Sequence, residues 1–176
     1  MAEIKLVPRS EVDPSITWDM TLLYPSDEAF YAELDKLKKE MKAFKEKYEN
    51  KLGDLEVLDE AIRQYEAIEL AVYRASHYAE LPMTVDRLNP KVIENATAFE
   101  AVSVSYAENM SFVMTELISL DEDFLNQFVA KKRPDLAYFV EKVIRQKKHT
   151  LSKDAEQVLS NLSSLPGFYQ LYEVTK

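Results

Sequence analysis

The scarcity of glycine is the feature that most restricts what this chain can fold into. Only Gly53 and Gly167 occur among its 176 residues. Loops that cradle phosphate need several glycines, because only a backbone without side chains can approach the anion closely. All-β folds need many tight turns, which also favour glycine. The sequence therefore excludes dinucleotide-binding and P-loop folds, and it argues against an all-β architecture.

Apolar residues recur at helical spacing in three long stretches, which predicts three long amphipathic helices. The first stripe is Phe30, Leu34, Leu37, Met41, Phe44 and Tyr48. The second is Leu58, Ile62, Tyr65, Ile68, Val72, Tyr73 and Ala79, with Glu69 among them. The third is Ile93, Ala96, Phe99, Ser103, Tyr106, Met110, Val113 and Leu117. Short links between them favour an antiparallel bundle in an all-α fold.

Helix start signals divide the rest of the chain. Good N-cap residues precede the stripes at Ser26 and at Asn89, which is followed by Pro90. The third helix should run over residues 90–118, about 40 Å at 1.5 Å per residue. Shorter helices should follow from three further start residues, Asp121, Pro134 and Ser152. The region around Gly53, residues 50–54, should end the first helix.

The predicted domain layout has an extended arm over residues 1–25 and a helical domain over residues 26–176. Prolines at positions 8, 14 and 25 keep the arm out of helix. Trp18 and Leu22 are apolar anchors, and we expect the arm to pack on the bundle because a tryptophan is costly to leave in water. The breadth of the second stripe and the small residues of the third helix predict an exposed apolar face and weak self-association.

The net charge of the chain limits the classes of partner that it is expected to bind. The chain carries a formal charge of -9, which disfavours nucleic acid and anionic membranes. Its basic clusters, at residues 36–39, 131–133 and 145–148, lie among acids and are typical of solvated helix faces. No signal-peptide pattern and no apolar run of about 18 residues occurs, so we expect a cytoplasmic protein.

Residues for catalysis or metal binding are sparse. There is no cysteine, and the two histidines, His77 and His149, are far apart. Neither belongs to an H-E-x-x-H motif, and the glutamate that a di-iron bundle places three residues earlier is replaced by Arg74 and Gln146. We therefore predict no catalytic, metal or cofactor residue on this chain, with substrate-binding residues unassigned.

A few polar residues near the stripes have a functional and a simpler interpretation. Glu69, Glu100 and Glu108 could form a carboxylate site, although acids at helical spacing more often face water. The tyrosines could line a peptide groove, but a tyrosine on a wide helical face is more often core with its hydroxyl at the rim; they are Tyr65, Tyr73, Tyr78 and Tyr106. His149 fits a helix junction better than a substrate contact, and His77 fits a packed histidine better than a ligand.

Three segments together resemble the oligoendopeptidase F family. They are Trp18-Asp19-Met20-Thr21 with residues 23–30, the stretch 81–90 that opens the third helix, and residues 145–152 followed by Glu156. The resemblance covers nearly the whole chain and implies the N-terminal domain of a zinc metallopeptidase. Family members are all-helical and cleave short peptides inside a channel, where zinc-polarised water attacks the peptide carbonyl.

This resemblance carries no catalytic residue onto the chain, because the family's zinc motif belongs to a C-terminal catalytic domain. The implied role of the present residues is to wall or lid the channel, with the catalytic domain of the same polypeptide and short peptides as partners. The aromatic stretch at residues 168–172 so near Lys176 suggests that the chain is truncated. The alternative is a free-standing helical adaptor, and the length of the source reading frame distinguishes the two.

Overall fold

The computed structural model describes residues 11–147, and all its regular elements are helical. The long helices follow the chain in the order α1 (Asp27–Tyr48), α2 (Leu55–Glu80), α3 (Pro90–Met110), α4 (Phe112–Ser119), α5 (Glu122–Lys131) and α6 (Ala137–Lys147). Short 3₁₀ helices lie between or before them: η2 (Pro14–Ile16), η3 (Met20–Leu22), η4 (Pro82–Thr84) and η5 (Pro134–Leu136). The predicted all-α fold is confirmed.

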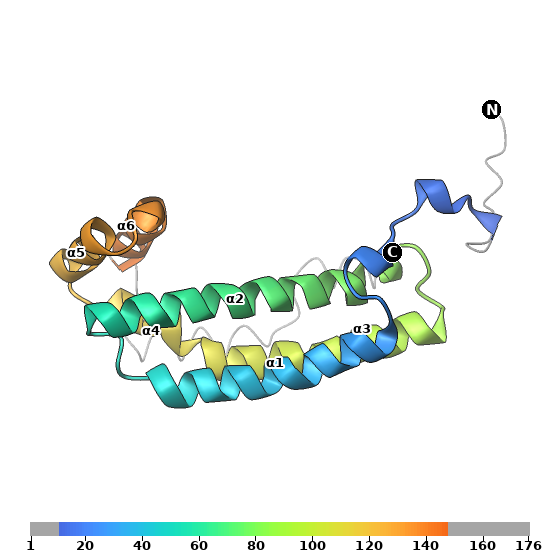
Figure 1. The fold of residues 1–176 in the computed structure, drawn as a ribbon, viewed down its shortest axis with the longest axis horizontal. Helices are drawn as coiled ribbons and strands as arrows, with labels where there is room; N and C mark the ends of the chain where they lie inside the picture. The colour runs from blue at the N-terminus through green and yellow to red at the C-terminus, as the bar shows by residue number, and fades with distance from the viewer. Residues whose placement is uncertain (1–10, 148–176) are drawn as a thin grey trace, which may run out of the picture.

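Helices α1, α2 and α3 lie side by side as an antiparallel bundle, and α5 and α6 sit together over the first turns of α2 (Figure 1). Every residue of the predicted first stripe is buried in the core. The three-and-four spacing of that stripe puts all its members on one face of α1, which packs against both α2 and α3. In the part of the chain that the structure describes, no helix is both long and apolar enough to cross a membrane.

The helix starts follow the expected capping chemistry. The Ser26 hydroxyl accepts from the Ala29 N–H at 3.3 Å, and the Asn89 side chain accepts from the Lys91 N–H at 3.0 Å. Asp121 caps α5 in the same way. Such bonds satisfy N–H groups that have no partner within the helix.

Helix α1 ends at Tyr48, directly before residues 50–54 as expected, but Gly53 is not the residue that makes the left-handed turn. Asn50, with φ of 63°, adopts the left-handed conformation, while Gly53 has no positive φ. Asparagine tolerates this region better than most residues. The Glu116 carboxylate from α4 accepts from the N–H groups of Asn50 and Leu52, which ties this turn to α4.

The third helix is interrupted, whereas a single helix over residues 90–118 was expected. It breaks at Ser111 into α3 and α4. The Lys45 ammonium donates to the Glu108 carbonyl at 2.9 Å, and an unbroken helix would offer that carbonyl to the Phe112 N–H. A tertiary contact from α1 thus competes with the helical hydrogen bond at the break, which periodicity in the sequence cannot reveal.

The last part of the prediction is only partly covered by the described residues. Asp121 does open α5, and Pro134 opens a short 3₁₀ turn before α6. Val140 and Val143 are buried as expected. The helix predicted from Ser152 and the aromatic stretch at residues 168–172 lie outside the residues that the structure describes.

Candidate functional site

The N-terminal arm is fixed to the bundle through its last residues. Tyr24 is buried, with its ring edge-on to the rings of Phe30 and Tyr78. The Arg74 guanidinium donates to the Leu23 carbonyl at 2.6 Å and lies over the Tyr24 ring at 4.6 Å. The backbone of the arm is therefore held where it enters α1.

The earlier part of the arm corrects the expectation of packed anchors. Trp18 is 66% exposed and Leu22 is 81% exposed. Two more apolar side chains close to the α2–α3 connection, Val85 and Leu88, are also exposed. Residues 11–147 do not bury these apolar side chains, so their exposure to water is unfavourable in free energy.

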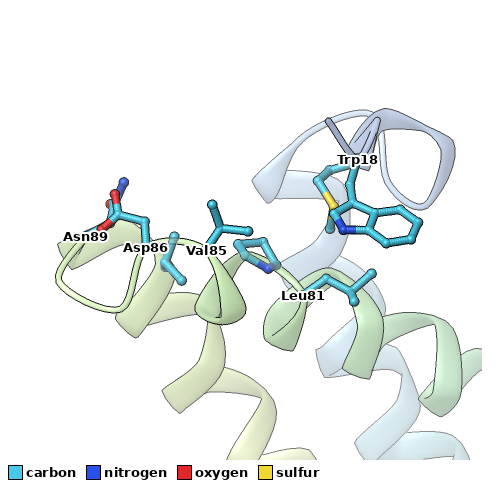
Figure 2. Close-up of a pocket in the computed structure, with 8 residues that line it drawn as sticks. Trp18, Leu81, Val85, Asp86 and Asn89 are labelled. Atoms are coloured by element: carbon cyan, nitrogen blue, oxygen red, sulfur yellow. The ribbon is translucent and has the colours of Figure 1, made fainter. Parts of the chain in front are cut away.

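A hollow of about 130 Å³ lies between the arm and the connection from α2 to α3. Figure 2 shows Trp18 over Leu81, with Val85, Asp86 and Asn89 following along the connection. We call this site the Trp18 hollow; its lining is Trp18, Met20, Leu81, Pro82, Val85, Asp86, Asn89 and Val92. Its wall is mainly apolar, with Asp86 and Asn89 as polar groups, so it suits an apolar group from a partner better than a charged ligand.

Beneath the hollow, a polar cluster joins the starts of α1 and α3 to the end of α2. Asp27 accepts from the Tyr78 hydroxyl at 2.8 Å and from the Asn95 amide at 3.0 Å. The Asn95 carbonyl oxygen accepts from Tyr31 at 2.7 Å, and Lys91 lies 3.5 Å from Asp27. The cluster fixes the direction in which α3 leaves the connection.

Electrostatics in this cluster keep the carboxylate charged and the phenol neutral. Burial opposes ionisation of Asp27, but the hydrogen bonds from Tyr78 and Asn95 and the charge of Lys91 outweigh it and lower its pKa. Burial, followed by the hydrogen bond to Asp27, raises the pKa of Tyr78 to about 12. The pair therefore keeps its donor and acceptor roles across the neutral range, as a structural contact does.

A second polar group joins α2 to α3 in mid-bundle. The Tyr106 hydroxyl donates to the Glu69 carboxylate and is also hydrogen-bonded to the Tyr65 hydroxyl, with 2.9 Å between the oxygens. Burial and the hydrogen bond to Glu69 raise the pKa of Tyr106 above its ordinary value. Three residues singled out in the sequence are thus brought together, but as a partly buried contact between helices.

The other singled-out residues do not gather into a site. Glu108 offers its backbone carbonyl, not its carboxylate, to Lys45. Nδ1 of His77 lies 2.8 Å from the Tyr73 carbonyl, and the two rings are 4.2 Å apart, which suits a packed histidine. Glu100 borders a different groove on α3. His149 lies outside the described residues.

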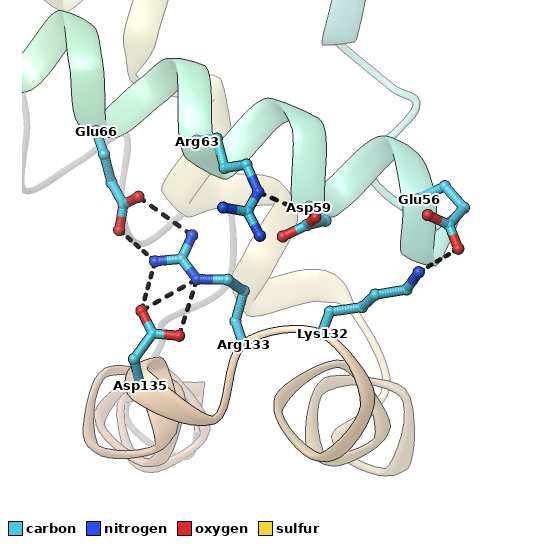
Figure 3. A network of polar contacts seen from close by, with 7 residues as sticks. All are labelled: Glu56, Asp59, Arg63, Glu66, Lys132, Arg133 and Asp135. Carbon is cyan, nitrogen blue, oxygen red and sulfur yellow. Dashed lines mark hydrogen bonds and ion pairs between the residues drawn. The ribbon is translucent and has the colours of Figure 1, made fainter.

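An ion network that the sequence patterns did not indicate joins α2 to the α5–α6 pair. Arg133 is only 7% exposed, although its basic cluster suggested a solvated helix face. Its guanidinium donates to Glu66 at 2.7 Å and to Asp135 at 2.6 Å, and Lys132 pairs with Glu56 (Figure 3). These hydrogen bonds raise the pKa of Arg133 above its ordinary value. The sequence held only a weak indication of this burial, because Arg133 directly precedes Pro134, which begins a turn.

The described residues do not fit a zinc site. Residues 11–147 contain no group of three or more histidine, cysteine, aspartate or glutamate side chains placed to hold a metal ion. Zinc needs three or four such ligands around one point. The prediction that this chain carries no catalytic or metal residue stays a prediction for the chain as a whole.

Comparison with known proteins identifies sequences that are similar to this chain. The sequence profile of the family described as Oligopeptidase F matches residues 116–167. An oligoendopeptidase F homolog of Borreliella burgdorferi is 24% identical, over 94% of this chain and 28% of its own length. Oligopeptidase PepF of Bacillus subtilis is 29% identical, over 95% of this chain and 26% of its own length. The chain is related to the oligoendopeptidase F family.

The fold agrees with this relationship. A crystal structure described as a peptidase from Chlamydophila abortus superposes with a TM-score of 0.73 at 25% identity, over 90% of this chain and 27% of that one. This chain therefore corresponds to about a quarter of the length of its oligoendopeptidase F relatives, over their N-terminal part.

Two of the segments that resemble oligoendopeptidase F meet at the Trp18 hollow. Trp18 and Met20 come from the first segment, and Leu81 and Asp86 come from the stretch 81–90. These segments are far apart in the sequence and adjacent in space. The third segment begins at the end of α6 and continues beyond the described residues.

Proposed function

We propose that this chain is the N-terminal helical domain of a zinc-dependent endopeptidase that cleaves short peptides. In this proposal the bundle helps to enclose the substrate channel, and the catalytic domain follows in the same polypeptide. The observation that carries it is the match of nearly the whole chain to about a quarter of each oligoendopeptidase F relative. Zinc and the reacting groups belong to the remaining part of such a polypeptide.

The Trp18 hollow is the surface we assign to contact with that remaining part. It combines an exposed tryptophan with an apolar lining, and contiguous exposed apolar surface often marks an interface. Two segments that resemble the family build its wall, which supports a role shared with the relatives. The bundle itself then acts as a rigid support, because its core side chains are buried.

A peptidase assay tests the proposal directly. The present chain and the longer polypeptide encoded by its source gene are compared for cleavage of an internally quenched peptide. We expect cleavage by the longer polypeptide alone, loss of activity with a chelator and recovery with zinc. Cleavage by the present chain, or a source gene with a stop codon after Lys176, would contradict the proposal; the stop codon would favour the helical adaptor.

Substitution at the hollow tests the assigned surface. In the longer polypeptide, Trp18→Asp places a charge in the apolar contact and should lower activity or thermal stability strongly. Tyr138→Asp is the matched control, because Tyr138 is also an exposed aromatic but lies on α6. Equal effects of the two substitutions would remove the hollow from the proposal without touching the peptidase assignment.

Two further expectations accompany the proposal. Weak self-association of the present chain should appear as a concentration-dependent sedimentation coefficient. A cytoplasmic location should appear in fractionation of the source cells. Each can fail without affecting the relationship to oligoendopeptidase F.

A further inference from the structure

A second groove lies where the last turn of α2 and the short helix η4 meet α3. It encloses about 320 Å³, which suits a few side chains of a ligand, and it shares no lining residue with the Trp18 hollow. We call it the α3 groove, and its apolar lining is Met83, Ile93, Ala96 and Phe99. Residues 11–147 leave this lining partly open to solvent, since the Ile93 side chain is 43% exposed.

Four polar side chains complete the lining, and two of them are already hydrogen-bonded. The hydroxyls of Thr97 and Ser103 donate to backbone carbonyls of α3 itself, at 2.8 and 3.4 Å. The other two are Glu80 and Glu100, whose carboxylates form no ion pair or hydrogen bond with any residue that the structure describes. The groove therefore presents two uncommitted negative charges beside an apolar floor.

The cations of this region do not balance those charges. Among the described residues, no lysine or arginine lines the groove. Lys91, near the start of α3, lies 3.5 Å from Asp27 and 3.2 Å from Glu94, so its charge is already paired. The potential in the groove is therefore negative, which favours a ligand that carries a positive charge.

The unpaired carboxylates also distinguish a permanent interface from a ligand that binds and leaves. The cores of permanent protein interfaces are depleted in charged residues, because a buried carboxylate without a partner is costly. A second copy of the chain would bring a formal charge of -9 to the same acids. A short peptide with a basic side chain would pair with the carboxylates when bound and leave them in water when it departs.

We propose that the α3 groove binds the substrate peptide and selects a basic side chain that has an apolar neighbour. The basic group pairs with the carboxylates of Glu80 and Glu100, and the apolar side chain lies over Phe99 and Met83. This inference rests on the proposed function, because it gives that peptidase a preference among short peptides. The pairing is partly exposed to solvent, so the preference is modest and weakens as salt rises.

A nuclear magnetic resonance titration tests binding on the intact chain, where no cleavage is needed. The probe is an acetylated, amidated tetrapeptide of alanine, phenylalanine, arginine and alanine. Its control carries citrulline in place of arginine, which has nearly the same shape without the charge. Amide signals of Ile93, Thr97 and Ser103 should shift with the arginine probe, while the Trp18 indole signal stays unchanged. The dissociation constant should be on the order of 1 mM, and roughly tenfold higher for citrulline.

Substitutions that keep the side-chain shape identify the carboxylates. Glu80→Gln and Glu100→Gln should each raise the dissociation constant of the arginine probe by roughly two- to fivefold. Glu108→Gln is the matched control, because it removes the same charge from an exposed position on α3 outside the groove, and it should leave binding unchanged.

Three results of these titrations would overturn the proposal. The first is the absence of shifts in the groove, and the second is equal binding of the arginine and citrulline peptides. The third is a set of groove shifts that grow with the concentration of the chain without any peptide, which would mean that a second copy occupies the groove.

Kinetics of the longer polypeptide separate this inference from the proposed function. Glu100→Gln should raise KM for a quenched peptide that contains arginine and leave kcat unchanged, because the groove holds no reacting group. Cleavage with a KM that does not respond to Glu100→Gln would overturn the inference and leave the peptidase assignment intact. Charge-selective binding in the groove without any cleavage would support the site and contradict the peptidase assignment.

Discussion

In the α1–α3 bundle, Phe30, Leu37 and Phe44 have no exposed surface, whereas the α5–α6 pair meets α2 through charged side chains. Helix α6 packs on α4, and α5 packs on α6 and on the 3₁₀ turn η5. Apolar burial depends little on salt or pH, while ion pairs at a partly exposed contact weaken as salt rises. The comparison indicates a rigid bundle carrying an end piece that can loosen independently, because local unfolding follows the weakest contacts.

The largest expected effect tests the bundle. Phe44→Ala removes a ring that contacts Tyr48, Tyr65 and Phe112, and we expect a loss of about 3–5 kcal/mol in the free energy of unfolding. Urea denaturation followed by far-ultraviolet circular dichroism measures it. Leu22→Ala, at an exposed position, should stay within about 0.5 kcal/mol. A loss below about 1 kcal/mol for Phe44→Ala would mean that the core is not the source of stability.

The next largest effect is expected in the α5–α6 pair, which forms the end piece. Arg133→Ala leaves Glu66 and Asp135 without their common partner, and because both carboxylates are half-exposed we expect a local cost of about 1–3 kcal/mol. Hydrogen exchange should quicken in α5 and α6 and stay unchanged in α1. The control is Arg145→Ala, since Arg145 pairs with Glu141 at 2.6 Å and both side chains are exposed to solvent. Uniform acceleration across all helices would show that the end piece and the bundle unfold together.

A matched pair of N-cap substitutions tests the same difference between the bundle and the α5–α6 pair, with a smaller expected loss of stability. Ser26→Ala at the start of α1 and Asp121→Ala at the start of α5 should each cost about 1 kcal/mol in their own helix. The first should lower global stability in urea, and the second should register mainly as faster exchange in α5. Equal shifts of the denaturation midpoint would contradict the division between the two regions.

An effect of similar size is expected in the polar cluster under the arm. Tyr78→Phe removes one hydrogen bond to Asp27 and should cost about 1 kcal/mol at neutral pH. The pKa of Tyr78 is raised to about 12 in the folded state, so the folded chain holds this proton longer than the unfolded chain. That contribution is complete below about pH 10, the usual tyrosine pKa, and is lost as the pH rises toward 12.

Alkaline denaturation checks the sign. Between pH 10 and 12 the unmodified chain should lose stability more steeply than Tyr78→Phe. Tyr138→Phe, at an exposed position on α6, should follow the unmodified chain. Parallel curves for all three proteins would mean that the hydrogen bond between Tyr78 and Asp27 does not couple to folding.

Sequence patterns predicted the bundle well for local reasons. The first stripe and the caps at Ser26 and Asn89 depend on spacing within one helix and on backbone chemistry. These signals act over a few residues, so a single sequence contains them completely. The resemblance to oligoendopeptidase F was likewise present in short segments, and the comparisons confirm it.

The candidate site could be predicted only in part. Trp18 was expected to be an anchor packed on the bundle, but the structure leaves it exposed at a hollow. The hollow exists because the arm and the α2–α3 connection lie close together in space. No sequence pattern within either segment indicates this contact. The burial of Arg133 was missed for the same reason, since its partner Glu66 is on another helix.

What the sequence alone determined was the all-helical character, the helix starts, the apolar face of each helix and the family relationship. Only the tertiary structure decided the break at Ser111, the left-handed turn at Asn50, and the exposed or buried state of Trp18 and Arg133. Helix formation depends on neighbours three and four residues apart, which the chain order specifies. Breaks and burial depend on groups such as the Lys45 ammonium, which reach their partners only after the helices have packed.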